Sequence, residues 1–209
     1  KVNRDQALIF GLLLSFISVF SLSYFTNSLS GLLLLFTILF YLFVYTIWLK
    51  KKTPQNIVIG GASGALPPVI GWTIATNNIS LEPIIFFLII FFWTPSHFWA
   101  LSLYKADDYK KAKIPMLPLT DGIEKTKFYI FIYSLIMLPL VILPYVINFA
   151  GLVYLIPAML LTLYYNYICY DLFRFKKNKF DIKQAKKVFG YSILYLFLIF
   201  LLFIIDNLI

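Results

Sequence analysis

Two adjacent carboxylates, Asp107 and Asp108, lie in a stretch that is otherwise rich in lysine. Carboxylate oxygens are ligands that Mg²⁺ prefers, and Mg²⁺ in proteins is often shared with the phosphates of a substrate. Lysine ammonium groups suit the charge of a diphosphate, and four of them lie nearby: Lys105, Lys110, Lys111 and Lys113. The pattern predicts a site for magnesium and a phosphate ester. A solvated acidic pair is the alternative.

The chain contains a single histidine, His97, two residues after Pro95 in an apolar segment. Helical spacing places His97, Tyr104 and Asp108 on one stripe, so that in a helix continuing to Asp108 the imidazole would lie about 16 Å from that carboxylate. Pro95 predicts a bend close to the histidine. His97 is therefore a candidate ligand or positioning group inside a cavity. A buried imidazole bonded to a neighbour is the alternative.

Residues 56–72 read NIVIGGASGALPPVIGW, which combines closely spaced glycines with two consecutive prolines. Gly60 and Gly64 form a small-xxx-small face that lets another helix approach. Pro67 and Pro68 have no N–H group, so they predict a break in the helix. At membrane depth such a break is tolerated where it lines a cavity or is buried against protein. Asn56 is expected on the same face at the mouth of that cavity.

These motifs lie in a chain with the composition of a membrane protein. Of 209 residues, 61% are hydrophobic and 13% are charged, against about 45–50% and about 25% in soluble domains. This composition excludes a disordered chain, a disulfide scaffold and a soluble nucleic-acid-binding domain. A bilayer-spanning helix needs about 20 apolar residues. We expect an all-α polytopic bundle in one domain, residues 1–209, with spans at 7–26, 31–49, 57–76, 84–104, 128–147, 151–170 and 188–207.

The cations predict the orientation of these spans. All 18 Lys and Arg residues lie in the segments 1–6, 50–56, 105–127 and 171–187, and the other connectors contain none. By the positive-inside rule the cationic segments face the cytoplasm and the C-terminus faces the opposite side. The net charge of +9 therefore reflects topology, together with an anionic lipid surface or substrate, and does not indicate nucleic acid.

Residues 56–72 and the segment PSHFWALSL at 95–103, followed by Asp108-Tyr109 and IPMLP at 114–118, resemble a known family. They are similar to the heme branch of the UbiA-type intramembrane prenyltransferases, the protoheme IX farnesyltransferase (heme O synthase) family. The resemblance implies a fold of nine helices with two aspartate-rich motifs. The seven spans here would be its last seven, and the chain, which begins at Lys1 without Met, is expected to lack two N-terminal helices and the first motif.

The resemblance also implies an activity and roles for residues. The reaction would transfer a farnesyl group from farnesyl diphosphate to a vinyl group of heme b, giving heme O. Asp107 and Asp108 would hold Mg²⁺, and His97 would orient or ligate the heme. The residues expected to contact the diphosphate or the intermediate are Lys50, Lys105, Lys110, Tyr45, Asn56 and Tyr104. Tyr104 stands where quinone prenyltransferases carry another aspartate, which weakens the metal site of this motif.

The location and partners implied are those of a cell inner membrane enzyme with its active-site loops in the cytoplasm. The mitochondrial inner membrane is the alternative location. Farnesyl diphosphate, heme b and the lipid bilayer are the expected partners, together with a heme A synthase or oxidase-assembly protein. The competing functions are a quinone or chlorophyll prenyltransferase and, from another class, a transporter. A transporter predicts internal repeats and ionisable residues at mid-bilayer, and apart from His97 the apolar centres contain no such residue.

Overall fold

A computed structural model describes residues 3–174 and 182–209, and every regular element in these residues is a helix. Within these two ranges, seven helical segments are long and apolar enough to cross a membrane, as the sequence predicts. The helices are α1 (Arg4–Phe25), α2 (Ser28–Leu39) with its π-helical continuation η1 (Phe40–Leu49), α3 (Asn56–Ala65), α4 (Pro67–Thr76), α5 (Leu81–Tyr104), α6 (Ala106–Lys111), α7 (Leu117–Thr120), α8 (Ile123–Val146), α9 (Leu152–Arg174) and α10 (Ile182–Leu208).

Most of these helices extend beyond the apolar runs that predict them. The helix α8 begins five residues before the expected start at 128, and α10 begins six residues before 188. The added turns contain charged residues. They can be helical because only the apolar centre of a spanning helix must lie in lipid. The expected connector 105–127 also contains α6, α7 and the first turn of α8.

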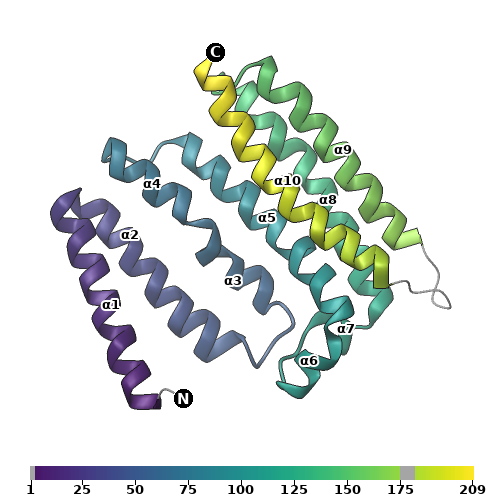
Figure 1. Ribbon diagram of the computed structural model, residues 1–209, viewed down its shortest axis with the longest axis horizontal. Coiled ribbons are helices and arrows are strands. Elements are labelled where there is room, and N and C mark those ends of the chain that lie inside the picture. The colour runs from purple at the N-terminus through teal and green to yellow at the C-terminus, as the bar shows by residue number, and fades with distance from the viewer. Residues whose placement is uncertain (1–2, 175–181) are drawn as a thin grey trace.

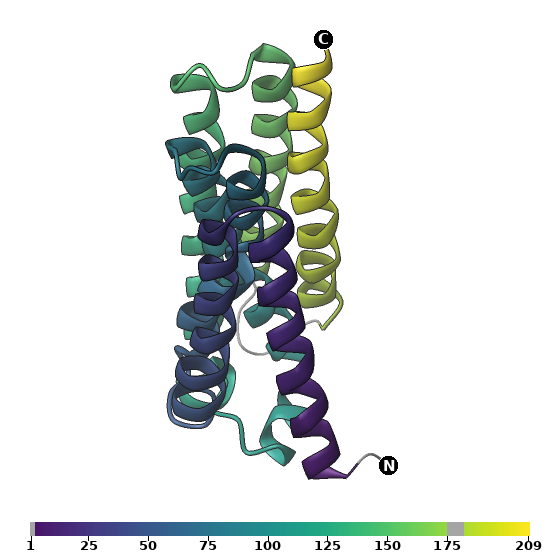
Figure 2. The same cartoon turned by 90° about the vertical axis from the view of Figure 1, so that its left-hand side faces the viewer.

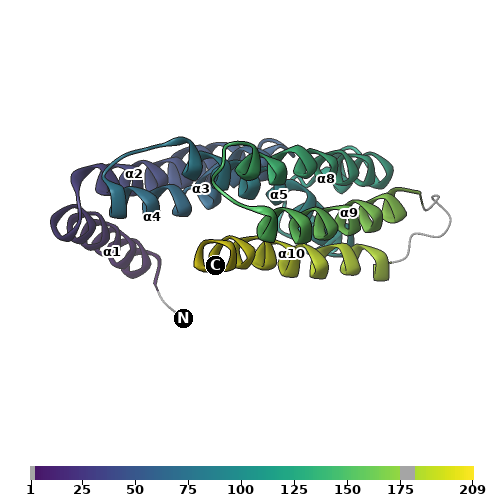
Figure 3. The same ribbon diagram turned by 90° about the horizontal axis from the view of Figure 1, so that it is seen from above.

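The helices α5, α8, α9 and α10 form a four-helix bundle. The other spanning helices, α1, α2 with η1, α3 and α4, form a wing at its side. The helix α5 packs against α8 and α10, and α9 packs between α8 and α10. The helices α3 and α4 pack on α5 and lead to α2, while α1 packs on α2 at the edge (Figures 1 and 3). The two termini lie at opposite ends of the bundle (Figures 1 and 2), as an odd number of spans requires. The end that carries α6 and α7 is called here the cationic end.

The core of the bundle is rich in large aromatic side chains, and the hydroxyl groups of two of its tyrosines hydrogen-bond to serine and threonine on neighbouring helices. Tyr165 and Tyr195 are fully buried and stacked on each other. The Tyr165 hydroxyl lies 2.7 Å from Ser96 Oγ on α5, and the Tyr195 hydroxyl lies 3.0 Å from Thr162 Oγ1 on α9. Lipid supplies no hydrophobic drive between helices, so such interhelical bonds and close packing hold the helices in register.

A carboxylate joins the end of α10 to the start of α9. The Asp206 carboxylate accepts hydrogen bonds from the backbone N–H of Gly151 at 2.6 Å and of Tyr154 at 2.9 Å. The first N–H groups of a helix have no partner within that helix, and a negative charge there also interacts favourably with the helix dipole. The last turn of α10 therefore caps the start of α9, through a contact to Gly151 that spans 55 positions of the sequence.

Replacing Asp206 with Ala should destabilise the bundle by about 1–2 kcal/mol, the usual cost of a lost N-cap. Thermal unfolding of the purified protein in detergent should show a lower melting temperature. The matched control is Asn207→Ala, because among the described residues the Asn207 side chain bonds to Phe203 O of its own helix and to no other helix. Equal melting temperatures for the two variants would contradict the capping role.

Candidate functional site

Three cavities of the described residues meet at the junction between α3 and α4. A cavity of about 370 Å³ lies between η1, α3 and α5. A second, of about 550 Å³, lies between α4, α5 and α10, and a third, of about 520 Å³, lies between α1, α2 and α3. Gly64 lines all three. The cavities therefore adjoin at the place where the sequence predicts an interrupted helix.

The interruption itself is confirmed. The helix α3 ends at Ala65 and α4 begins with Pro67 and Pro68, with Leu66 between them. The fixed φ angle of proline suits the first turn of a helix, where the missing N–H is not needed. Both prolines line the 550 Å³ cavity. Of the two environments that tolerate a break at membrane depth, the structure has the cavity.

Two of the three glycines of α3 allow close helix contacts, and the third borders the cavities. A Cβ atom at Gly60 would overlap the ring of Tyr45, and one at Gly61 would lie 3.0 Å from the Thr94 methyl group. A Cβ atom at Gly64 would meet nothing within 4 Å. The predicted close approach is thus made by Gly60 with η1, while Gly61 lets α5 approach. Gly64 instead borders the open space of the cavities.

Tyr45 covers the cationic end of the 370 Å³ cavity. Tyr41 and Tyr45 line this cavity from η1, with their ring centroids 5.1 Å apart. The ammonium group of Lys50 lies over the Tyr45 ring, 5.8 Å from its centroid. A cation held on the face of an aromatic ring is attracted by the ring quadrupole. Two of the predicted site residues, Tyr45 and Lys50, therefore lie together.

His97 lies in α5 beside the cavities, and its ring is held on both faces. It is 8% exposed and stacks on Trp93 at 4.3 Å and on Phe189 at 4.6 Å between ring centroids. Its Nδ1 atom lies 2.6 Å from Ser192 Oγ on α10. Trp93 lines two of the cavities. The imidazole is thus buried and bonded to a neighbour, and it is also one turn from the cavity wall.

The helix α5 runs through Pro95 as one element but does not continue to Asp108. It ends at Tyr104, Lys105 has φ −112° and ψ 19°, and a new helix, α6, carries Asp107 and Asp108. The expectation of one continuous stripe from His97 to Asp108 is therefore wrong beyond Tyr104. The turn at Lys105 redirects the two carboxylates, which are exposed at the cationic end.

The acidic pair is the only part of a metal site that the described residues supply here. Lys105 Nζ lies 3.2 Å from Asp108 Oδ2 in an exposed ion pair, and Lys110 is exposed on the same short helix. Residues 3–174 and 182–209 contain no group of three or more His, Cys, Asp or Glu side chains that could hold a metal ion. Mg²⁺ often takes only one or two carboxylates and completes its shell with substrate phosphates and water. The pair fits a cation held in that way.

Tyr109 is a residue of this region that the sequence reasoning missed. It is half-buried on α6, and burial raises its pKa, with smaller contributions from Tyr104 and from the Asp108 charge. Tyr109 also interacts electrostatically with Tyr45 on η1. Tyr109 thus follows the acidic pair directly in the chain and is electrostatically coupled to Tyr45, which lines the cavity. A tyrosine directly after the second aspartate was the available signal.

Lys186 is a second missed residue, and it comes from the last helix. Its ammonium group lies 5.7 Å from the centroid of the Tyr104 ring. Tyr104 contacts Phe189 edge to face at 5.9 Å, and Phe189 stacks on His97. A chain of ring contacts thus joins a cation at the cationic end to the buried imidazole. No local pattern reveals it, because Lys186 and Tyr104 are 82 positions apart in the sequence.

Asn56 is buried and joins two loops of the cationic end. Its Nδ2 atom donates to the backbone carbonyl of Thr53 at 2.6 Å and to that of Pro115 at 3.4 Å. Its Oδ1 atom is buried without a hydrogen-bond partner among the described residues. The structure therefore places Asn56 behind the mouth, where it holds the segment that follows α6.

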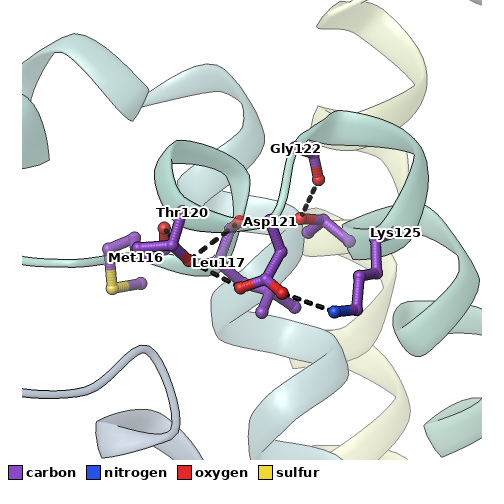
Figure 4. A network of polar contacts seen from close by, with 7 residues as sticks. Met116, Leu117, Thr120, Asp121, Gly122 and Lys125 are labelled. Atoms are coloured by element: carbon purple, nitrogen blue, oxygen red, sulfur yellow. Dashed lines mark hydrogen bonds and ion pairs between the residues drawn. The ribbon is translucent and has the colours of Figure 1, made fainter.

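That segment is fixed again where α7 meets α8. Figure 4 shows the Asp121 carboxylate accepting hydrogen bonds from the Thr120 hydroxyl and from the Lys125 ammonium group. These contacts lower the pKa of Asp121. The Thr126 hydroxyl donates to the Gly122 carbonyl at 2.8 Å. The chain that follows α6 is therefore anchored at Pro115 and again at the α7–α8 junction.

Comparison with known proteins identifies relatives over nearly the whole chain. The chain matches the UbiA prenyltransferase family over residues 1–198. It is 75% identical over 207 residues to the protoheme IX farnesyltransferase of Pelagibacter ubique, covering 99% of this chain and 68% of the relative. For the proteins of the same name from Parvibaculum lavamentivorans and Azorhizobium caulinodans the identities are 46% and 50%, covering 99% and 96% of this chain and 65% of each relative. The chain thus spans about two thirds of the length of these relatives.

A solved structure shares the fold. It is described as giving structural and mechanistic insights into the biosynthesis of digeranylgeranylglyceryl phosphate synthase in membranes. The TM-score is 0.77 at 20% sequence identity, and the match covers 98% of this chain and 70% of that chain. The arrangement of the helices is therefore that of a known intramembrane fold.

The two glycines of the small-xxx-small pair should respond differently to an added methyl group. Gly60→Ala should destabilise the protein by about 1–3 kcal/mol, the usual cost of overpacking, because its Cβ atom would overlap the Tyr45 ring. Gly64→Ala is the matched control and should unfold at or above the wild-type temperature, since its Cβ atom enters open space. Thermal unfolding in detergent measures both. A loss at Gly64 equal to that at Gly60 would contradict this division.

Proposed function

The chain belongs to the UbiA prenyltransferase family, and on this premise we propose that it transfers the farnesyl group of farnesyl diphosphate to a vinyl group of heme b. The observation that carries the proposal is the identity of 46–75% to proteins named protoheme IX farnesyltransferase over at least 96% of this chain. The product would be heme O. A membrane-embedded cavity that adjoins a charged mouth fits a donor with an apolar tail and an anionic head.

We propose that the diphosphate binds at the cationic end. Asp107 and Asp108 would hold Mg²⁺, which neutralises charge on the diphosphate and so makes it a better leaving group. The outer phosphate oxygens would be bound by three lysines. Lys105 directly precedes α6 and Lys110 lies in it, while Lys50 lies beside Tyr45. Charge-assisted hydrogen bonds from ammonium groups to phosphate are among the stronger ones.

Three further side chains would contact the diphosphate, and a fourth residue, Asn56, would act indirectly. Lys186 lies over Tyr104, where it would meet the diphosphate from the side of α10. Tyr104 and Tyr109 would donate their hydroxyl protons to phosphate oxygens. Asn56 would act through the loops that it joins, because its Nδ2 atom is bonded to the carbonyls of Thr53 and Pro115.

The proposed reaction breaks the bond between farnesyl C1 and the diphosphate oxygen, and the electron pair leaves with the diphosphate. The terminal vinyl carbon of heme b forms the new bond to C1. Water then adds its oxygen to the adjacent carbon and releases a proton, which leaves a hydroxyl group on the product. The step needs no oxidant or reductant, since heme b and water supply all the atoms of the product besides the farnesyl group.

The cavity wall suits the allylic cation that forms as the diphosphate leaves. The rings of Tyr41, Tyr45, Trp93 and Phe98 line the 370 Å³ cavity. Aromatic faces attract cations, by about 2 kcal/mol or more in a desolvated site, and an apolar wall limits early attack by water. His97 would orient the heme from the neighbouring turn of α5, with its iron as the ligated atom.

We also propose a location. The protein is a multi-pass membrane protein with bacterial relatives, and the cationic end would face the cytoplasm of a cell inner membrane under the positive-inside rule. The described residues form one folded unit in which the wing packs on α5, in agreement with a single prenyltransferase domain. With the cationic end in the cytoplasm, the site would be open to the side of the membrane where the water-soluble diphosphate head of the donor is available.

Membranes that contain the protein, expressed from its complete reading frame, should convert heme b and radiolabelled farnesyl diphosphate to labelled heme O in the presence of Mg²⁺. Asp108→Asn should lower this rate at least 100-fold, about 2.7 kcal/mol at the transition state, and raise the Mg²⁺ concentration needed. Chromatography of extracted hemes measures the product. Label that appears in an added quinone acceptor instead of heme would contradict the proposed substrate.

The control for this experiment is Asp121→Asn, which makes the same change of charge at the cationic end. Asp121 bonds to Lys125 and Thr120 at the α7–α8 junction and has no proposed contact with substrate. Its variant should keep the wild-type rate. A near-normal rate in Asp108→Asn, with comparable amounts of protein in the membrane, would remove the metal role of Asp108.

Lys186→Gln should raise the KM for farnesyl diphosphate about tenfold, or about 1.4 kcal/mol, with a smaller effect on the KM for heme b. The matched control is Lys187→Gln at the next position, where the ammonium group lies over Tyr164 of α9. Initial rates at varied concentrations of each substrate measure both effects. Equal KM values for the two variants would exclude Lys186 from the diphosphate site.

A further inference from the structure

Ser192 on α10 contacts two residues of α5 at once. Its side chain is fully buried, and its Oγ atom lies 2.6 Å from His97 Nδ1. Its backbone carbonyl accepts a hydrogen bond from Trp93 Nε1 at 2.9 Å. These two α5 residues are one turn apart, and Trp93 also covers one face of the imidazole. One residue of α10 therefore fixes both the ring of His97 and the ring stacked on it.

The hydrogen bonds of Ser192 determine which nitrogen of His97 carries the proton. The Ser192 hydroxyl has one proton, and it is donated to the Phe189 carbonyl at 2.6 Å, because a carbonyl can only accept. Toward His97 the same oxygen must then act as the acceptor. A neutral imidazole that donates from Nδ1 has a bare lone pair on Nε2.

The remaining contacts hold the ring in place. Trp93 and Phe189 stack on its two faces with interplanar angles of 20° and 26°. The Phe98 ring meets it edge to face at 5.1 Å. A half-turn of the ring about the Cβ–Cγ bond would keep both stacks but break the contact to Ser192, and intermediate rotations would break the stacks as well. No hydrogen bond to Nε2 is found among the described residues, so this atom is left available for a ligand.

We propose that Ser192 is a positioning residue that holds His97 as the Nδ1–H tautomer and thereby presents the Nε2 lone pair to the iron of heme b. This inference rests on the proposed function for the identity of the ligand. A partner on the far nitrogen of a ligating histidine fixes the ring and raises the basicity of the ligating nitrogen. A neutral hydroxyl provides this at membrane depth without the cost of a buried carboxylate.

The test measures heme b binding to the purified protein by absorption spectroscopy and titration. Ser192→Ala should weaken heme affinity about tenfold, the lower end for loss of such a partner, and change the heme absorption spectrum. Ser192→Cys keeps most of the volume but offers only a weak acceptor, so it should show the same loss. Ser192→Thr keeps the hydroxyl and should restore wild-type affinity and spectrum.

Two comparisons separate positioning from packing. Thr162→Val removes another buried interhelical hydroxyl bond, to Tyr195, without touching His97, and should leave the heme spectrum unchanged. In a His97→Ala background, Ser192→Ala should have no further effect, because contacts that act through one another are not additive. An equal additional loss in that background would show a packing effect and overturn the proposal, as would wild-type binding by both Ser192→Ala and Ser192→Cys.

The outcomes also separate this inference from the proposed function. If His97→Ala leaves the heme spectrum and affinity unchanged, the inference fails, whereas transfer of labelled farnesyl to heme still supports the proposed function. If the wild-type protein binds heme with the expected response to Ser192 but transfers no farnesyl group, the proposed reaction fails and the role of Ser192 stands.

Discussion

The absence of water inside a bilayer is the constraint on which this structure depends. Each backbone N–H and C=O group at membrane depth needs a partner in the protein, and a continuous helix supplies all of them. The junction at Leu66 is the exception, because Pro67 and Pro68 cannot donate to the carbonyls one turn before them. Gly64 and both prolines line cavities. The break and the cavity are therefore one feature, since an interrupted backbone at membrane depth is tolerated where it is buried against protein or lines a cavity.

The same constraint explains why hydroxyl groups hold the four-helix bundle together. Lipid is as apolar as leucine, so burial of apolar side chains alone gives helices little reason to stay in one register. The pair of Ser96 with Tyr165, and the bond from Trp93 to Ser192, each suit one register only. A slip of α10 by one turn, about 5.4 Å, would remove Ser192 and Phe189 from His97 together. The direction in which the imidazole points is thus a consequence of how α5 and α10 are aligned.

The spans and the break were predictable from the sequence, because bilayer thickness sets helix length and proline lacks an N–H group. The contact of Lys50 with Tyr45 depends on local helix geometry, because the two residues are close in the chain. The exposure of Asp107 and Asp108 agrees with the solvated acidic pair that was the alternative interpretation, and the proposed roles of all four residues stay predictions. The turn at Lys105 was not predictable, since Tyr104 and Ala106 both suit a continuous helix. Gly61 rather than Gly64 faces α5, because the rotation of a helix about its axis depends on its neighbours. Lys186 and Ser192 were missed for a stronger reason: their roles exist only once α10 lies beside α5.

The arrangement of lysines over tyrosines bears on how the mouth would bind an anion. A free lysine side chain loses about 2 kcal/mol of rotamer entropy when it is ordered, and that loss subtracts from binding. The Lys50 and Lys186 ammonium groups are already held over the rings of Tyr45 and Tyr104, so part of this loss precedes binding. These rings belong to η1 and α5, the helices that flank α3. A prenyl diphosphate held between the two cations would have its polar head at the cationic end, and its apolar tail would follow the aromatic wall toward Gly64. Under the proposed function, the charged end would thus orient the substrate, and the broken helix would supply the space into which the tail extends.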